Sequence, residues 1–165
     1  MATIGSAGTA KTIQRLTATT GVNASLAALT QAGGAAAGTL NIAQIRAQNV
    51  AADLAERSTT VQYPTVNVYC EKIVNNLAEK FQTFSGTVQM TVEIRHSQDG
   101  LDGLEAAVEL YADAVMRSLD GNRGDWGDGM YYAGGYQVAF GAVKHGGRNF
   151  VQVAKVSFEI AVGIN

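Results

Sequence analysis

The C-terminal stretch from Met130 to Asn165 decides the fold, and it reads MYYAGGYQVAFGAVKHGGRNFVQVAKVSFEIAVGIN. From Asn149 to Ile164, apolar residues take every second position, which is the pattern of a strand with one buried face. A second apolar run, Tyr131 to Val143, precedes it, and the glycine-containing segment Lys144 to Arg148 separates the two. Two such runs about a short turn predict a long antiparallel hairpin.

The length of this predicted hairpin bears on function. A strand of about fifteen residues spans roughly 50 Å at about 3.3 Å per residue, whereas ordinary strands have about five or six residues. Part of such a hairpin extends beyond its own core, and exposed strand edges there need partners. This favours an assembly protein over an enzyme.

The composition is that of a single folded domain over residues 1–165. Of the 165 residues, 47% are apolar and 16% are charged, which is too apolar for a disordered chain and low in charge for a solitary monomer. The net charge of −2 does not predict tight binding to a phosphate backbone. No apolar run approaches the roughly 20 residues of a membrane span, and the N-terminus lacks signal-peptide features, so we expect a protein made in the cytoplasm.

The first third of the chain predicts short helices. Residues 1–8 are small and polar and are expected to be ordered only by contact, which leaves a flexible N-terminus. Apolar spacing predicts a helix from Thr9 and a second short helix capped by Asn23. Residues 33–38 form a glycine and alanine connector, and the segment after it divides into a strand near 40–48 and a short helix near 50–57.

The rest of the chain predicts strands about one main helix. Pro64 opens a strand over Thr65–Ile73, and a half-buried strand follows over Val88–Arg95. Asp102 and Glu105 form a variant capping box for a helix that Gly121 ends in a left-handed conformation. This order predicts an α+β fold with a mainly antiparallel sheet, helices packed on one face and a long C-terminal β-hairpin.

The connection between the two central strands, Asn75 to Gly86, carries three large apolar residues. Leu77, Phe81 and Phe84 are predicted to plug the core beneath this loop.

The acidic segment from Asp120 to Gly129 suggests a calcium loop but does not complete one. An EF-hand loop starting at Asp120 requires glycine at its sixth position and glutamate at its twelfth. Those positions hold Asp125 and Tyr131. The alternatives are a solvated turn or a contact loop anchored by Trp126.

Catalytic motifs are likewise incomplete. His96, Ser97 and Asp99 are close in sequence, but no nucleophile-elbow motif surrounds the serine. Cys70 is the only cysteine, which excludes an intrachain disulfide and a multi-cysteine metal site. We therefore expect no catalytic residue, no cofactor and no metal.

Aromatic and basic residues near the hairpin are candidates for a protein interface. The aromatic residues either pack on the sheet or anchor a partner, because exposed aromatic residues and arginine are common interface anchors. The basic tip of the hairpin either contacts an acidic patch or phosphate, or keeps the turn soluble. The candidate interface residues are Arg123, Asp125, Trp126, Tyr131, Tyr132, Tyr136, Lys144, His145 and Arg148.

Five runs from about Thr39 onward carry a family resemblance, namely Tyr63–Glu71, Glu79–Gly86, Ser97–Asp99, Gly135–Val138 and Gly146–Phe150. In element order and general character, the chain resembles tail terminator (tail-completion) proteins of long-tailed bacteriophages. The resemblance implies a small α+β subunit of a hexameric ring in the virion. Such a ring caps the tail tube protein, halts its polymerisation and meets the head-tail connector protein, and genomic DNA passes through its lumen.

The chain departs from that family in its helical N-terminus and its glycine and alanine connector. Another neck subunit, such as a head-tail connector or stopper, therefore remains an alternative. From other classes, a small enzyme or metal-binding module and a peptide-binding module that uses a free strand edge also remain.

Overall fold

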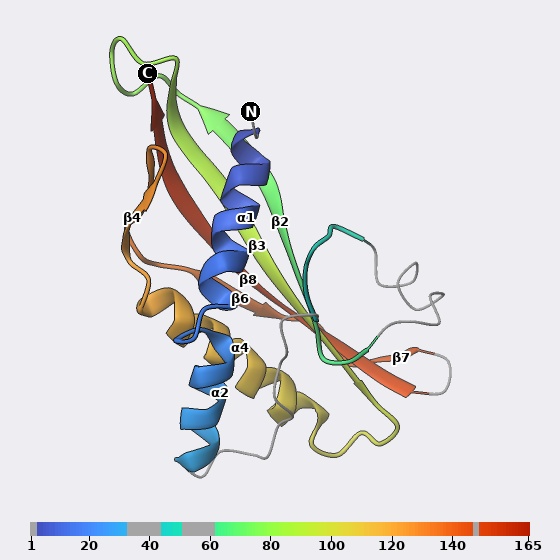
Figure 1. The fold of residues 1–165 in the computed structure, drawn as a ribbon. Coiled ribbons are helices and arrows are strands. Elements are labelled where there is room, and N and C mark those ends of the chain that lie inside the picture. The colour runs from blue at the N-terminus through green and yellow to red at the C-terminus, as the bar shows by residue number, and fades with distance from the viewer. Residues whose placement is uncertain (1–2, 33–43, 51–61, 147–148) are drawn as a thin grey trace.

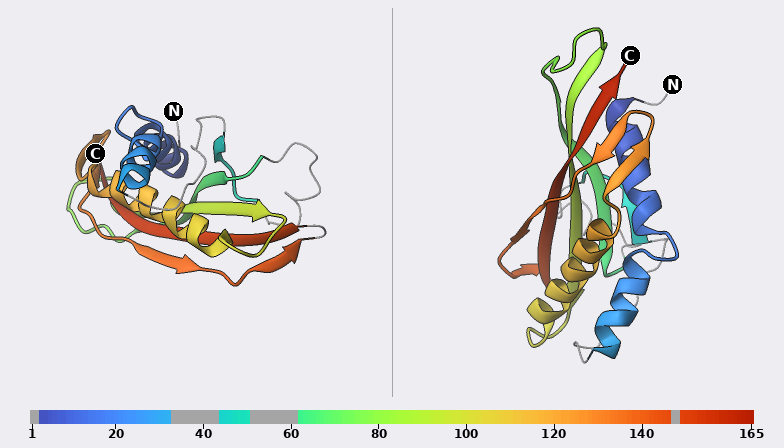
Figure 2. Two further views of the ribbon diagram at one scale, coloured as in Figure 1. Left: turned by 90° about the horizontal axis from the view of Figure 1, so that it is seen from below. Right: turned by 90° about the vertical axis from the view of Figure 1, so that its left-hand side faces the viewer.

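The computed structural model describes residues 3–32, 44–50, 62–146 and 149–165. Three described helices pack on one face of a curled, mostly antiparallel sheet, which confirms the predicted α+β fold (Figures 1 and 2). The helices are α1 (Ile4–Leu16), α2 (Val22–Gln31) and α4 (Leu104–Asp120). The strands are β1 (Ile45–Ala47), β2 (Thr65–Asn75), β3 (Phe84–Gln98), β4 (Gly124–Gly127), β5 (Met130–Tyr132), β6 (Gln137–Phe140), β7 (Lys144–Gly146) and β8 (Asn149–Ile164).

Two long antiparallel strands, β3 and β8, form the spine of the sheet. They stay in register from Phe84 opposite Ile164 to Gln98 opposite Phe150. The order across the sheet is β1-β2-β3-β8-β5-β4, and β6 and β7 also pair with β8. β1 pairs with β2 in parallel and lies within the strand predicted near 40–48.

One strand of the predicted hairpin is confirmed, and the other is wrong. β8 is the long strand that the alternation indicates, but the preceding run is not one continuous strand. It breaks into three short strands, β5, β6 and β7. Gly134 and Gly135 cause the break between β5 and β6, because they adopt positive φ angles of 100° and 88°. Lys144 to Gly146 form β7 rather than the turn. Each segment still pairs with β8.

The core lies between the sheet and the helices. One face of β3 and β8 is apolar, and the main helix packs its apolar stripe against it as predicted. The buried members of these three elements are Val88, Met90, Val92, Ile94, Leu104, Val108, Tyr111, Val115, Leu119, Ala154, Val156, Phe158, Ile160 and Val162.

The N-terminal helix begins earlier than predicted. Thr3 caps α1, so residues 4–8 are its first turns. The helix faces the sheet with small residues, and a Cβ atom at Gly8 would lie 3.2 Å from the Met90 sulfur. Spacing of large apolar residues misses these first turns, because their contact with the sheet depends on close approach of the backbone.

The predicted helix caps are wrong in three places. Gly21, not Asn23, is the N-cap residue of α2. Gly103 precedes α4 with a φ of 81° and no side-chain cap hydrogen bond, so Asp102 forms no capping box. Gly121 is right-handed, with a φ of −78°.

Several predicted segments lie outside the described residues, namely the connector at 33–38 and all but the first residue of the helix near 50–57. Within the described part of the chain, no helix has both the length and the apolar character to cross a membrane.

Close packing of β2 against β3 makes Gly86 sensitive to substitution. A Cβ atom there would lie 1.9 Å from the Val74 carbonyl oxygen, so Gly86→Ala forces the backbone apart. We expect this change to lower the free energy of unfolding by about 1–3 kcal/mol in urea denaturation. Gly100→Ala is the control, since nothing lies within 4 Å of its Cβ position, and equal midpoints for the two variants would contradict the packing.

Candidate functional site

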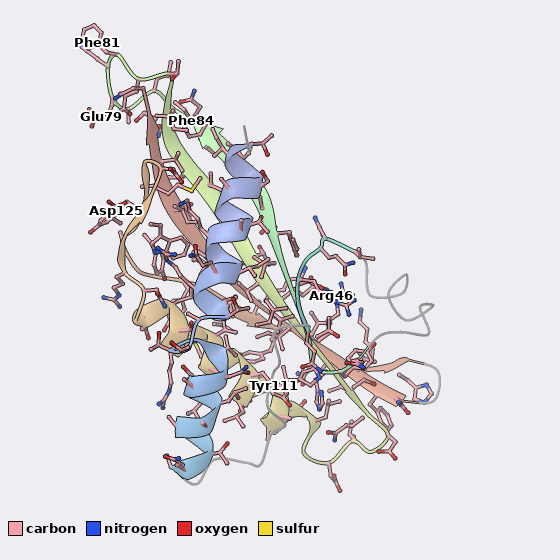
Figure 3. The ribbon with its side chains drawn as sticks, viewed as in Figure 1. Arg46, Glu79, Phe81, Phe84, Tyr111 and Asp125 are labelled. Carbon is pink, nitrogen blue, oxygen red and sulfur yellow. The ribbon has the colours of Figure 1, made fainter. Side chains whose placement is uncertain are left out.

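The connection between β2 and β3, residues 76–83, is the most prominent exposed feature, and we name it the β2–β3 tip. It projects from the end of the spine beyond the N-terminal end of α1 (Figure 1), and Phe81 lies at its outermost point (Figure 3). The exposed fraction is 100% for Phe81 and 61% for Leu77. The prediction that these two side chains plug the core is therefore wrong. Phe84, in contrast, begins β3 and packs partly against the core.

Hydrogen bonds hold the β2–β3 tip in one conformation. The Asn75 side-chain oxygen accepts from the backbone N–H groups of Leu77 at 3.3 Å and Ser85 at 3.1 Å. The Thr83 N–H donates to the Ile164 carbonyl at 2.8 Å, which ties the tip to the end of β8. The exposed apolar side chains are thus presented on a fixed loop.

The backbone of the tip is strained where those side chains attach. Leu77 has a φ of 48° and Phe81 a φ of 69°. Bulky side chains in this left-handed region cost about 1–3 kcal/mol each and persist mostly at functional positions. Neither side chain regains this free energy by burial in its own core, so the pair has the character of a contact site for a partner.

Two of the predicted interface residues belong to the core and are not exposed anchors. Trp126 and Tyr132 are buried, with ring centroids 5.4 Å apart, and both contact the Phe158 ring. The Arg15 guanidinium lies 4.5 Å from the Trp126 ring centroid, and the indole N–H donates to the Asn122 carbonyl. These contacts favour the alternative that the aromatic residues pack on the sheet.

A second residue of helix α1, Lys11, also holds the β4–β5 hairpin. The Lys11 ammonium donates to the Trp126 carbonyl at 2.8 Å and lies 2.9 Å from the Asp128 carboxylate. This hydrogen bond and charge lower the pKa of Asp128 below its usual value.

Of the other predicted interface residues in this region, Arg123, Asp125 and Tyr131 are exposed, and Tyr136 is partly buried against the core. Tyr131 is 52% exposed, and Asp125 is exposed beside it. The Tyr136 hydroxyl donates to Asp120 at 3.1 Å, and Arg123 lies 3.5 Å from the same carboxylate. Burial, followed by this Asp120 hydrogen bond and charge, raises the pKa of Tyr136.

The predicted basic tip is remote from that cluster. Lys144 and His145 are exposed on β7, where the His145 ring contacts the Phe150 ring edge to face at 5.4 Å. β7 pairs with the first residues of β8 and β5 with the last, so roughly 35 Å of strand separates the two groups. The structure therefore does not bring the predicted interface residues together. Arg148 lies outside the described residues.

The face of the sheet away from the helices, which we name the open sheet face, carries a buried ion pair that sequence reasoning missed. Glu93 and Arg95 are only 6% and 4% exposed, and the Arg95 Nε donates to the Glu93 carboxylate. The Tyr69 hydroxyl donates to Glu93 at 3.2 Å, and the Lys155 ammonium lies 3.9 Å from it. Burial, then the charge of Glu93, raises the pKa of Tyr69 to about 12.

These residues line a hollow of about 510 Å³ on the open sheet face. The Arg95 Nη2 donates to the Val50 carbonyl, but its Nη1 is buried and finds no hydrogen-bond partner among the described residues. The signal in the sequence is the alternation of Thr91, Glu93 and Arg95 with apolar residues. That pattern alone describes an ordinary solvated face.

In the described part of the chain, no three His, Cys, Asp or Glu side chains gather as metal ligands. His96 packs edge-on against Tyr111 with ring centroids 5.5 Å apart. Neither a scan against protein-family models nor a search of curated proteins finds a match for this chain.

Burial of Trp126 predicts that it acts in folding. We expect Trp126→Ala to lower the free energy of unfolding by about 3–5 kcal/mol, because it removes a large buried side chain. Tyr131→Ala, in the same hairpin, should change it by no more than about 0.5 kcal/mol. Chemical denaturation measures both, and a Trp126→Ala protein as stable as the Tyr131→Ala protein would contradict the packing.

Proposed function

We propose that this chain is the ring-forming tail terminator of a long-tailed bacteriophage, a structural subunit that caps the tail tube and joins the tail to the head connector. One observation carries the proposal, which is the ordered, strained β2–β3 tip with Leu77 and Phe81 fully or largely exposed. The element order, which resembles that of tail terminators, supplies the class of partner.

Open strand edges support the ring. β1 covers only Val66 to Val68 of β2, so the edge of β2 from Tyr69 to Asn75 has no partner strand among the described residues. Free backbone donors and acceptors on such an edge pair readily with another chain. When a contact between two different surfaces repeats around a rotation axis, it closes a ring. Each free strand edge then has a partner in a neighbouring copy. The resemblance supplies the number of subunits, six.

The β2–β3 tip supports a contact along the axis of the ring. It lies at the end of the spine, past the helical layer, where no described helix or strand covers it (Figures 1 and 2). An aromatic side chain that becomes buried in a partner contributes a large part of a typical interface energy. We assign this contact to the tail tube protein.

Removing the two apolar side chains of the tip tests the proposal. We expect Leu77→Gly with Phe81→Gly to weaken co-sedimentation with tail tubes at least tenfold, since anchor residues contribute about 2 kcal/mol or more. Glycine tolerates the positive φ angles, so the fold is retained. Negative-stain electron microscopy then shows tubes without a terminal ring.

Leu101→Ser is the matched control, since Leu101 is 56% exposed in the loop before α4, at the other end of β3. Capping by the glycine variant as efficient as that of the control would contradict the proposal. Rings that bind the head connector but never a tail tube would instead identify a connector or stopper subunit.

A further inference from the structure

Helix α4 carries a row of acidic residues on its outer side. Glu105, Glu109 and Asp113 follow one another at intervals of four residues, so they lie on one face about 12 Å long. We name these three residues the α4 acidic face. Arg117 lies 3.7 Å from Asp113, whereas neither glutamate pairs with a cation in the described part of the chain. Like charges at this spacing repel, and cations from a partner would relieve that repulsion.

The hollow on the open sheet face has the opposite charge. Among the described residues, it is lined by three basic side chains, Arg95, Lys144 and Lys155, and by one acidic side chain, Glu93. Glu93 already accepts from Arg95 and Tyr69, so the hollow keeps an excess of positive charge. The buried Arg95 Nη1, which has no hydrogen-bond partner in the described part of the chain, is a further unsatisfied donor beneath it.

The two surfaces match in length as well as in charge. Lys144 lies opposite Val151, four residues along β8 from Lys155, which is about 13 Å. The α4 acidic face spans about the same distance. The exposed side chain of Phe140, beside the hollow, offers apolar surface to the stems of the glutamates.

We infer that the hollow of one copy binds the α4 acidic face of the next copy in the ring. The helices cover one side of the sheet (Figure 2, left), and Glu93 and Lys155 of the hollow belong to the opposite face of β3 and β8, so each copy offers one surface in each direction. Such a heterologous contact repeats around a closed ring. The inference rests on the proposed ring, and complementary charge fixes the register of the contact.

Lys144 lines the hollow on the open sheet face. It also borders a groove beside Glu105 of its own chain. No ion pair joins the two in the described residues. Both charges therefore remain available to a second copy.

Charge reversal on each surface tests the contact. A hollow variant, Lys144→Glu with Lys155→Glu, and a helix variant, Glu105→Lys with Glu109→Lys, should each weaken ring formation at least tenfold in sedimentation velocity. An equal mixture of the two variants should form rings again, because every hollow then meets a helix of opposite charge. Only even numbers of subunits allow this alternation, and a hexamer satisfies it.

Lys80→Glu with Arg123→Glu is the control, since it changes the net charge as much as the hollow variant does, at exposed positions outside the hollow and away from the free edge of β2. This protein should form rings like the wild type. Wild-type rings together with normal assembly of the hollow variant would overturn the inference and leave the proposed function standing. A mixture that fails to assemble would also overturn it. A wild-type protein that never assembles would overturn the proposed function as well.

Discussion

The register between β3 and β8 is the constraint on which the rest of the structure depends. Because side chains alternate between the faces of a strand, this one register assigns each residue of both strands to the helices or to the open sheet face. It places Val92 and Val156 in the core and, one position along, Glu93 and Lys155 on the opposite face. The length of these two strands also carries the β2–β3 tip beyond the helical layer.

The same spine therefore separates two kinds of contact. The tip offers apolar area, which gives affinity when it is buried. The hollow and the α4 acidic face offer charge, which gives orientation and selects the correct partner more than it gives affinity. A subunit that binds its own copies laterally and another protein at its end requires surfaces that do not compete. The three surfaces proposed for these contacts, which are the apolar tip, the basic hollow and the α4 acidic face, differ in chemistry and lie on different parts of the fold.

Local patterns predicted the elements that depend on local physics. The alternation of β8 and the apolar stripe of α4 appear directly in the sequence, and both are confirmed. The break at Gly134 and Gly135 was missed, because apolar residues on either side of a strained pair look like one strand. The interface residues were predicted as neighbours because they flank the same hairpin, yet they pair with opposite ends of β8. Exposure of Phe81 depends on where the spine ends relative to the helices, which no local pattern records.

The central claim is that copies of this chain close into a ring. Sedimentation velocity of the purified wild-type protein over a wide concentration range, supported by native mass spectrometry, tests it most directly. The account predicts one discrete closed species of six chains in equilibrium with the monomer, and nothing larger. A monomer at every concentration, or an open series of growing filaments, would contradict it.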